Sequence, residues 1–488
     1  MTPNTSLPDN VISPAGPLRQ IDDLPGPAGV PLLGNLLQVK LNRIHRDIEQ
    51  WCGQYGKLFR VAFGPFKVVV VADPALIAVI LRDRPARFRR PSRSAEVALE
   101  MSGNLGLFMA EAEDWRNQRR MVMQALAPAA VKAYFPSLQK VATRLQRRWE
   151  GTARNGIAID LAADLKRYTV DIIAGLAFGT DVNTIESGED VIQRHLDVIL
   201  PAVARRSMSL FAHWRYVRLP ADRRLERSVG ALKQAVDGFI AQARGKLAAD
   251  PSRRTHPRNL LEAMIVAADD PGSGITDKEV SGNVMTMLLA GEDTTANTLA
   301  WAIWLLASHP KSLARARAEV DAELGPPHEW TPERFAGLSW LEACANETMR
   351  LKPVAPLLVV QALRDTTVAD IRVPAGTLVF GAMRSDSLRE EYFAQAAQFD
   401  PGRWLDAGHS ANSASRIGMP FGAGPRVCPG RHLAMLEMKM ALATLLGRFD
   451  IESVGTEHGG VPEERMSFTM EPGGLAMRLR PRAGAAVA

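Results

Sequence analysis

The chain of 488 residues has only three cysteines, Cys52, Cys344 and Cys428, and it has no low-complexity stretch. Three cysteines are too few for a disulfide framework, and they fit a reducing compartment. Residues 1–25 hold no apolar run long enough for a signal sequence or a membrane span. Their first basic residue is Arg19, which argues against a transit peptide. We therefore expect a cytoplasmic protein without a membrane span.

The chain also lacks a concentrated block of positive charge, although its formal net charge is +6. Its lysines and arginines are scattered and are not interleaved with aromatic residues, so we expect no nucleic-acid partner. Hydrophobic residues make up 46% and charged residues 23%, which is typical of a protein with a large core. No repeat or linker divides the chain. We expect a flexible, proline-containing segment over 1–26, one domain over 27–482 and a tail over 483–488.

Strand patterns are few and lie in three parts of the chain. Residues 57–62 and 67–72 are apolar and β-branched around the pair Gly64-Pro65, which predicts two strands joined by a turn. Residues 371–380 and 466–479 have a similar strand-and-turn character. Most of the remaining sequence has helical spacing. The predicted fold class is mainly α with small β-sheets.

The clearest predicted helix runs from Thr276 to about His309. Thr276 and Glu279 have the spacing of a capping box, and Pro310 follows the helix. At 1.5 Å per residue such a helix is roughly 50 Å long, enough to cross the whole domain.

Residues 290–295 of that helix, Ala-Gly-Glu-Asp-Thr-Thr, place an acid beside an alcohol in an otherwise apolar stretch. One interpretation is structural: Thr294 bonds the carbonyl four residues earlier, and Asp293 pairs with a buried base. The other interpretation is chemical, because a hydroxyl orients water and a carboxylate feeds protons.

Cys428 lies in the run Phe-Gly-Ala-Gly-Pro-Arg-Val-Cys-Pro-Gly over residues 421–430, directly before a helical stretch over 430–447. Free cysteines are usually small buried hydrophobes, and we expect that role for Cys52 and Cys344. Around Cys428, Gly424 and Gly430 permit close backbone approach. The positive end of the following helix would stabilise a thiolate. This setting suits an iron ligand.

The runs at 421–430 and 290–295 match F-x-x-G-x-R-x-C-x-G and A/G-G-x-D/E-T-T, and they resemble the heme-binding loop and the oxygen-activation motif of the cytochrome P-450 family. The resemblance is to a soluble, stand-alone heme domain of bacterial type. It implies the cytochrome P-450 fold, with heme b (iron protoporphyrin IX) held between the long central helix and the cysteine-loop helix. Cys428 would then bind the iron through its thiolate.

The resemblance also implies roles for the neighbours of the two motifs. Thr294 would organise a proton relay that Asp293 supplies, and the small residues Ala290 and Gly291 would leave room for oxygen and substrate. Arg426 would bind a heme propionate, Phe421 would pack near the porphyrin, and Gly424 and Gly430 would shape the loop.

Two further motifs match the family. Trp115 and Arg119 resemble its W-x-x-x-R pair, which hydrogen-bonds a propionate. Residues 357–361, where relatives often have a basic propionate contact, read Leu-Leu-Val-Val-Gln here, so we expect Arg119 and Arg426 to anchor the propionates.

Glu347 and Arg350 resemble the family's E-x-x-R pair, with Arg403 as the expected third member. The family usually has Glu where Gly402 stands, which makes the surroundings of Arg403 atypical.

By resemblance, the function is that of a heme-thiolate monooxygenase. It would use dioxygen and two externally supplied electrons to hydroxylate or epoxidise a lipophilic small molecule. Residues aligned with the family's substrate contacts are Leu107, Phe108, Thr286, Leu289, Ala290, Ala355, Leu357 and Phe468. Two alternatives remain open: a peroxide-driven peroxygenase or isomerase of the same fold, and a non-catalytic heme-binding sensor.

The chain ends soon after its last predicted sheet, so we expect electrons from a separate ferredoxin or flavodoxin and its reductase. NAD(P)H would therefore act only indirectly, through these redox partners. Arg116, Arg120, Arg431 and Lys439 are candidates for a docking face toward an acidic carrier.

Overall fold

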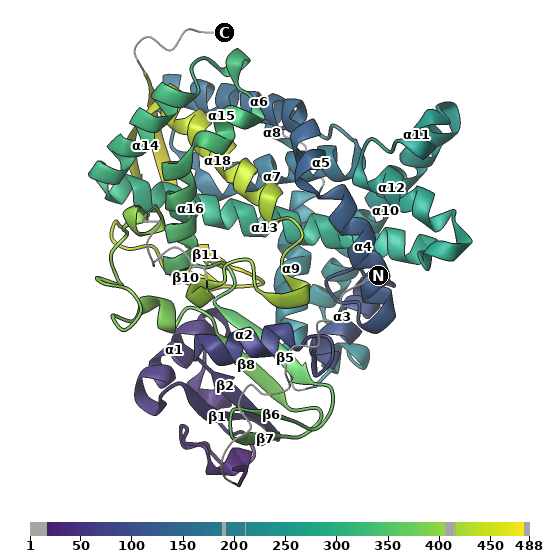
Figure 1. Ribbon diagram of the computed structural model, residues 1–488, viewed down its shortest axis with the longest axis vertical. Coiled ribbons are helices and arrows are strands. Elements are labelled where there is room, and N and C mark those ends of the chain that lie inside the picture. Colours follow the sequence, from purple (N-terminus) through teal and green to yellow (C-terminus); the bar gives the residue numbers. More distant parts are fainter. Residues whose placement is uncertain (1–16, 188–191, 210, 406–413, 415, 483–488) are drawn as a thin grey trace, which may run out of the picture.

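The computed structural model describes residues 17–187, 192–209, 211–405, 414 and 416–482. Helices dominate and the sheets are small, as the sequence predicts. Figure 1 shows a large helical lobe above a smaller lobe that is rich in β-strands. Within the described ranges, no helix is long and apolar enough to cross a membrane.

The β-rich lobe is built on a five-stranded sheet. Its strand order is β1 (Leu58–Phe63), β2 (Phe66–Val71), β8 (Leu378–Ala382), β5 (Leu357–Ala362) and β3 (Phe88–Arg89). The hairpin predicted around Gly64-Pro65 is confirmed, with each strand shifted by one residue. Helices α1 (Ile44–Tyr55) and α2 (Pro74–Arg82) accompany this sheet (Figure 1).

The N-terminal segment joins this lobe before residue 27. Ile21 and Leu24 are buried in the same cluster as Val69 and Ile371, and the Arg19 guanidinium pairs with Asp370 at 2.6 Å. Ile21 and Leu24 thus anchor residues 17–26 to this lobe, whereas residues 1–16 and 483–488 lie outside the described part of the chain.

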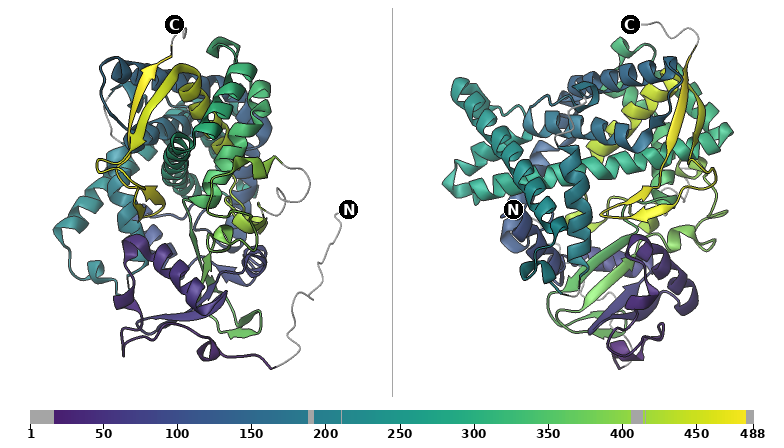
Figure 2. Two further views of the ribbon diagram at one scale, coloured as in Figure 1. Left: turned by 90° about the vertical axis from the view of Figure 1, so that its left-hand side faces the viewer. Right: turned by 180° about the vertical axis from the view of Figure 1, so that it is seen from behind.

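The helical lobe is organised around α13 (Asp277–Ser308). Thr276 is its N-cap and forms the predicted capping box with Glu279, and His309 is its C-cap. The left view of Figure 2 looks along this helix, which other helices surround. Its main partners are α7 (Leu161–Phe178), α12 (Leu260–Ala268), α16 (Ser339–Leu351) and α18 (Arg431–Arg448).

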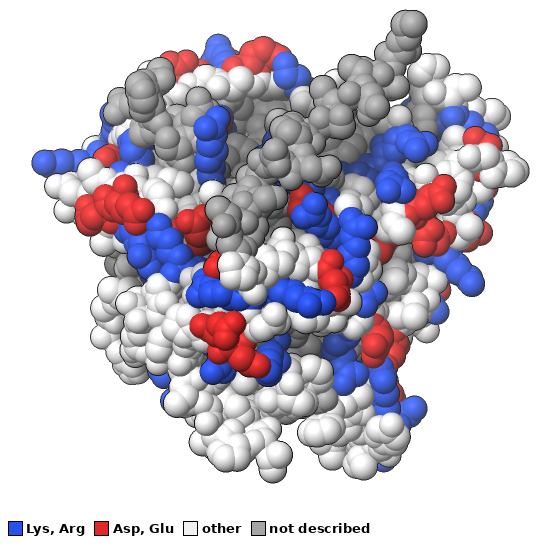
Figure 3. Space-filling view, turned by 60° about the horizontal axis from the view of Figure 1, so that its bottom comes forward, with Lys and Arg blue, Asp and Glu red and all other residues white. Residues whose placement is uncertain are grey.

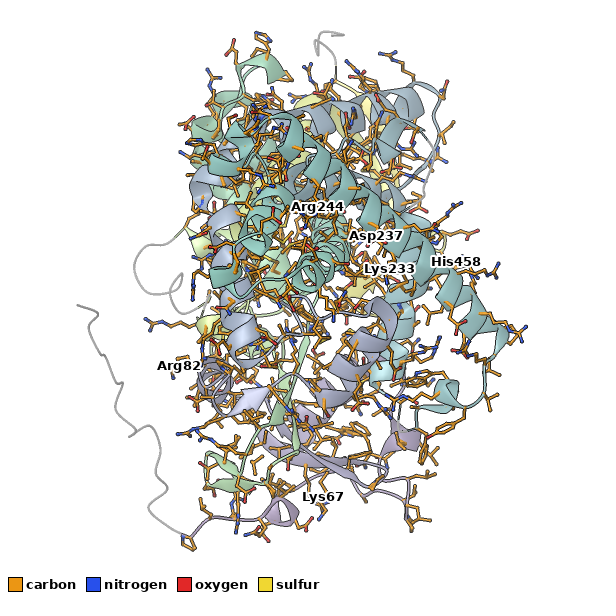
Figure 4. All side chains as sticks on the ribbon, turned by 90° about the vertical axis from the view of Figure 1, so that its right-hand side faces the viewer. Lys67, Arg82, Lys233, Asp237, Arg244 and His458 are labelled. Carbon is orange, nitrogen blue, oxygen red and sulfur yellow. The ribbon has the colours of Figure 1, made fainter. Side chains whose placement is uncertain are left out.

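The remaining helices complete the lobe. They are α3 (Ser92–Ser102), α4 (Ala112–Ala125), α5 (Pro128–Ala133), α6 (Phe135–Arg154), α8 (Thr184–Ser187), α9 (Gln193–Ser207), α10 (Pro220–Ala249), α11 (Ser252–Thr255), α14 (Pro310–Glu323) and α15 (Pro332–Gly337). Lys233, Asp237 and Arg244, labelled in Figure 4, mark the course of α10.

Three smaller sheets account for the other predicted strands. The segment 371–380 contains β7 (Ile371–Val373), which pairs with β6 (Thr366–Val368), and the start of β8. The segment 466–479 contains the end of β10 (Glu464–Met466), then β11 (Met470–Pro472) and most of β12 (Ala476–Pro481). β12 lies between β4 (Ile159–Asp160) and β9 (Phe449–Gly455).

Candidate active site

One face of α13 is open in the middle of an otherwise buried helix. Thr286, Ala290 and Thr294 are spaced by four residues and therefore share that face. Ala290 is exposed and the two threonines are half-buried, although Leu288 and Thr295 beside them are buried. The Thr294 hydroxyl donates to the Ala290 carbonyl at 2.8 Å. The open face thus carries one small residue flanked by two hydroxyls.

Asp293 lies on the neighbouring, buried face of α13. Its carboxylate accepts hydrogen bonds from Asn297 at 3.2 Å and from the Thr469 hydroxyl, and it lies 3.3 Å from Lys166 Nζ. Both contacts of the structural interpretation are therefore formed, by Thr294 and by Asp293. The chemical interpretation stays open as well. Lys166 also contacts Asp197, an exposed carboxylate, and so connects Asp293 with the surface.

Gly291 serves a purpose different from the one expected. A Cβ at this position would lie 3.0 Å from the Ile173 side chain on α7. Its missing side chain therefore allows α7 and α13 to pack closely, whereas Ala290 is the small residue on the open face.

The Cys428 loop folds against the C-terminal end of α2. Cys428 N–H donates to the Phe421 carbonyl at 2.9 Å, which closes the loop. Gly424 has φ +69°, and a Cβ there would lie 2.6 Å from the Leu81 carbonyl oxygen, so only glycine fits without strain. Gly430 has an ordinary φ of −84°, and its role in close approach to a cofactor stays a prediction.

The sulfur of Cys428 lies at the N-terminus of α18, as the sequence predicts. Burial raises the pKa of the Cys428 thiol, while the Gly430 N–H and the charges of Arg119 and Arg431 lower it. Pro429 has no N–H, so Gly430 is the donor that reaches the sulfur. Burial outweighs these groups, so the pKa of the thiol is raised overall.

Arginines gather beside this loop, and two of them were missed in the sequence. Arg84 is buried and Arg90 is half-buried, and both act electrostatically on Arg426, which also interacts with Arg119. Arg426 forms an ion pair with Glu111. The Glu111 carboxylate also acts electrostatically on Arg84 and Arg90. Burial and the Arg426 charge lower the pKa of Arg84 to about 10.

This cluster has the properties of an anion site. Among the described residues, Nε and Nη2 of Arg84 and Nε of Arg426 are buried without a hydrogen-bond partner. Buried guanidinium groups need acceptors, and a single carboxylate does not balance four positive charges. The two propionates of a heme fit this need.

Arg90 follows β3, the strand that pairs with the end of β5 through Phe88↔Ala362 and Arg89↔Gln361. The Arg90 guanidinium lies 3.7 Å from the Phe108 ring centroid, and its Nε donates to the Phe108 carbonyl at 3.2 Å. Arg90 thus stands between the arginine cluster and Phe108.

Trp115 and Arg119 lie on α4, as predicted. Trp115 is buried, and the Arg426 guanidinium lies 4.7 Å from its ring centroid. Arg119 is half-buried near Cys428 and Arg431. The two motifs that were expected at the propionates therefore meet in space.

The predicted Glu347, Arg350 and Arg403 group is formed in full. Arg350 Nε and Nη2 each lie 2.8 Å from the buried Glu347 carboxylate, and Arg403 Nε lies 3.0 Å from it. Trp404 Nε1 adds a bond of 2.9 Å. With Gly402 in place of Glu, Asp400 accepts the Gly402 N–H at 3.0 Å and so holds the turn that carries Arg403.

The proposed substrate residues differ in their exposure to solvent. Phe108 and Phe468 face each other with ring centroids 6.3 Å apart. Leu107 is buried, and its N–H donates to Asn283 of α13 at 3.0 Å. Phe108, Ala290 and Ala355 are exposed, and Thr286, Leu289, Leu357 and Phe468 are half-buried.

The expected docking face needs one correction. Arg116, Arg120 and Arg431 are exposed, but Lys439 is buried and donates to the Phe335 carbonyl at 3.2 Å. Helix α18 is buried on nearly all sides beyond its first turns, which removes Lys439 from the surface. On the face shown in Figure 3, basic side chains are interspersed with acidic ones.

A hollow of about 350 Å³ lies beside the cysteine loop. It is lined by Asn346, Trp404, Met419, Pro420, Phe421, Gly422, Val427 and Arg431. Arg431 thus borders both the hollow and the exposed basic surface.

Comparisons with known proteins agree with this geometry. The family model "Cytochrome P450" matches residues 24–478. The human mitochondrial 25-hydroxyvitamin D-1 alpha hydroxylase is 29% identical over 465 residues, which are 91% of this chain and 89% of that protein. A self-sufficient cytochrome P450 monooxygenase of Aspergillus niger is 26% identical over 94% of this chain, which spans only 42% of that protein.

Solved structures show the same fold. The crystal structure of the cytochrome P450DA heme domain has a TM-score of 0.82 and 25% identity, covering 96% of this chain and 99% of that one. The chain belongs to the cytochrome P450 family. It is an oxidoreductase of the heme-thiolate monooxygenase class, whose cofactor is heme with an axial cysteine thiolate.

Proposed function

We propose that Cys428 is the axial ligand and that the enzyme hydroxylates or epoxidises a lipophilic small molecule. The observation that carries this proposal is the open stripe of Thr286, Ala290 and Thr294 on the buried helix α13. A monooxygenase needs such a break in its core, because substrate and oxygen must reach the cofactor away from bulk water.

The residues present fit a heme. Cys428, with the Gly430 N–H at its sulfur, supplies the thiolate, and the buried nitrogens of Arg84 and Arg426 supply donors for propionates. Arg119 and Arg90 add positive charge to the same arginine cluster. When bound, thiolate-ligated heme supplies reductive activation of dioxygen.

The protein's own part in the reaction is proton handling and exclusion of water. The Thr294 hydroxyl holds a water molecule at the open face of α13, and Asp293 passes a proton toward it from the buried side. Lys166, 3.3 Å from Asp293, keeps that carboxylate in place between turnovers. Phe108 and Phe468, an aromatic pair among the proposed substrate residues, would help to exclude water.

The largely apolar residues at the open face support a lipophilic substrate. For the electrons, we propose a separate ferredoxin or flavodoxin with an NAD(P)H-dependent reductase. The exposed Arg116, Arg120 and Arg431 support this choice, because they offer positive charge to an acidic carrier. Cytoplasmic location stays a prediction.

The test is a screen of lipophilic compounds for a shift of the heme absorption, followed by turnover of each binder. We expect product with dioxygen, a ferredoxin or flavodoxin, its reductase and NAD(P)H. Turnover with peroxide but never with electron donors would replace the proposal by a peroxygenase or isomerase. Binding with no product under either condition would indicate a heme sensor.

A further inference from the structure

A second carboxyl, that of Glu292, lies beside Asp293 in the interior. We propose that Glu292 is a positioning residue that stores a proton for Asp293, at the inner end of a polar cluster that reaches the surface at Asp197. This inference rests on the proposed oxygen chemistry and adds to it the source of the protons. The proton leaves the Glu292 carboxyl, enters the Asp293 carboxylate and is replaced from water at Asp197, with no change of oxidation state.

The surroundings of Glu292 favour the protonated, neutral form of its carboxyl group. Glu292 is fully buried, and within the described ranges neither of its side-chain oxygens makes a hydrogen bond of good geometry. The Gln193 side chain is close enough to lower the pKa of Glu292 by hydrogen bonding, while its own Oε1 is buried without a partner. Buried acceptor atoms with so few donors are costly, and a proton on Glu292 supplies one more donor.

The charges around Glu292 favour the same state. The groups that face this cluster are Lys166 from α7, Asp197 from α9, Asp293 from α13 and Glu471 from β11, and Arg465 from β10 acts on Glu471. Lys166 is the ammonium that all four carboxyl groups, Glu292 included, share in this part of the described structure. Burial and the charge of Asp293 raise the pKa of Glu292 to about 8. Close carboxyl groups share protons rather than ionise together.

Two connections lead from the cluster to water. Asp197, whose side chain is 52% exposed, accepts from Gln193 Nε2 at 3.0 Å, and Gln193 lies beside Glu292. Asp197 also lies 3.2 Å from Lys166 Nζ, which is 3.3 Å from Asp293. The Glu292 carbonyl accepts from Thr169 of α7 at 2.9 Å, which fixes this part of α13 against α7. Glu292 and Asp293 therefore have a common surface residue.

The experiment compares wild type with Glu292→Gln, which keeps the size of the side chain and offers N–H donors but cannot release a proton. The quantity is product formed per NAD(P)H consumed, measured from pH 6 to 9. For wild type we expect this yield to fall as the pH rises through about 8, because Glu292 then loses its proton. For Glu292→Gln we expect a severalfold lower yield at neutral pH and no such fall.

Further variants separate this role from a structural one. Glu292→Asp should restore the yield and its fall with pH, because it restores a titrating group. Asp197→Asn, a change at the surface, should lower the yield at neutral pH. Asp237→Asn, at an exposed position of α10, should leave the yield unchanged. A Glu292→Gln profile identical to that of wild type would overturn the proposal. So would a lower yield whose pH dependence is unchanged.

Failure of the proposed function gives a different result. If wild type forms no product at any pH with any binder, the monooxygenase assignment of the site fails. If wild type forms product and only the pH profile of Glu292→Gln is unaltered, the proton store alone fails.

Discussion

The Thr294 hydroxyl donates to the carbonyl of Ala290 across 2.8 Å, on the open face of an otherwise buried helix. This bond satisfies the hydroxyl donor but leaves the hydroxyl oxygen free to accept from water. The hydrogen bond to Ala290 therefore serves the helix and also orients the Thr294 hydroxyl for the proposed proton relay. Asp293, adjacent in the chain, faces Lys166 on the buried side.

Thr294→Ala should divert electrons from product into hydrogen peroxide. The variant removes the hydroxyl that holds water at the open face, so the water molecule that delivers protons is no longer oriented. We expect product per NAD(P)H to fall severalfold while NAD(P)H consumption continues, measured by product analysis and a peroxide assay. Thr298→Ala is the matched control, because Thr298 makes the same bond to the carbonyl of Thr294 at 2.8 Å. An unchanged product yield in Thr294→Ala would remove Thr294 from the relay.

Gly424→Ala should destabilise the cysteine loop more than Gly422→Ala. Both glycines have positive φ, +69° and +73°, so each alanine adds strain of roughly 1–2 kcal/mol. Only Gly424 also brings a Cβ to 2.6 Å from the Leu81 carbonyl, whereas Gly422 faces open space. We expect an additional loss of roughly 1–3 kcal/mol for Gly424→Ala, measured by chemical unfolding. Equal losses would show that the contact with α2 is not tight.

Arg84→Leu should weaken heme binding and stabilise the protein without heme. The variant removes a buried guanidinium whose Nε and Nη2 have no partner among the described residues. Loss of a charge-assisted bond to a propionate should speed heme release roughly 10-fold or more, measured by transfer to a heme scavenger. Arg82→Leu, at the exposed position labelled in Figure 4, should release heme like wild type. A destabilised heme-free Arg84→Leu would mean that Arg84 has a structural role.

Glu437 should make stability depend on pH. This carboxyl on α18 is buried beside Thr295 of α13, and burial raises its pKa to about 8. A raised folded-state pKa gives stability that is complete below about pH 4.3 and is lost as the pH rises through about 8. The loss is on the order of 5 kcal/mol. It should disappear in Glu437→Gln and persist in Glu452→Gln, an exposed control, when unfolding is followed across this pH range.

Features of the fold that are encoded locally could be predicted from the sequence. The capping box of Thr276 and Glu279 and the turn at Gly64-Pro65 depend on neighbours in the chain, and both are confirmed. The failure at Lys439 has a physical reason. A basic residue in an amphipathic pattern suggests surface, but α18 is enclosed by several other helices, and Lys439 finds acceptors inside.

Four residues near the site that lie outside the sequence motifs could not be predicted. Arg84 and Arg90 reach the anion site through the end of α2 and the pairing of β3 with β5. Lys166 and Gln193 reach the acid pair only because α7 and α9 pack beside α13. No short-range pattern in the sequence marks these four residues, since their relevance arises from tertiary packing.

The most direct test of Cys428 as the iron ligand is the absorption spectrum of the reduced carbon monoxide complex. Wild type, Cys52→Ser and Cys344→Ser should all show the long-wavelength Soret band of a thiolate-ligated heme, because both other cysteines are buried away from the loop. Cys428→Ser should lose that band while any heme still bound is detected by its pyridine complex. Retention of the thiolate band in Cys428→Ser, or its absence from wild type, would contradict the assignment.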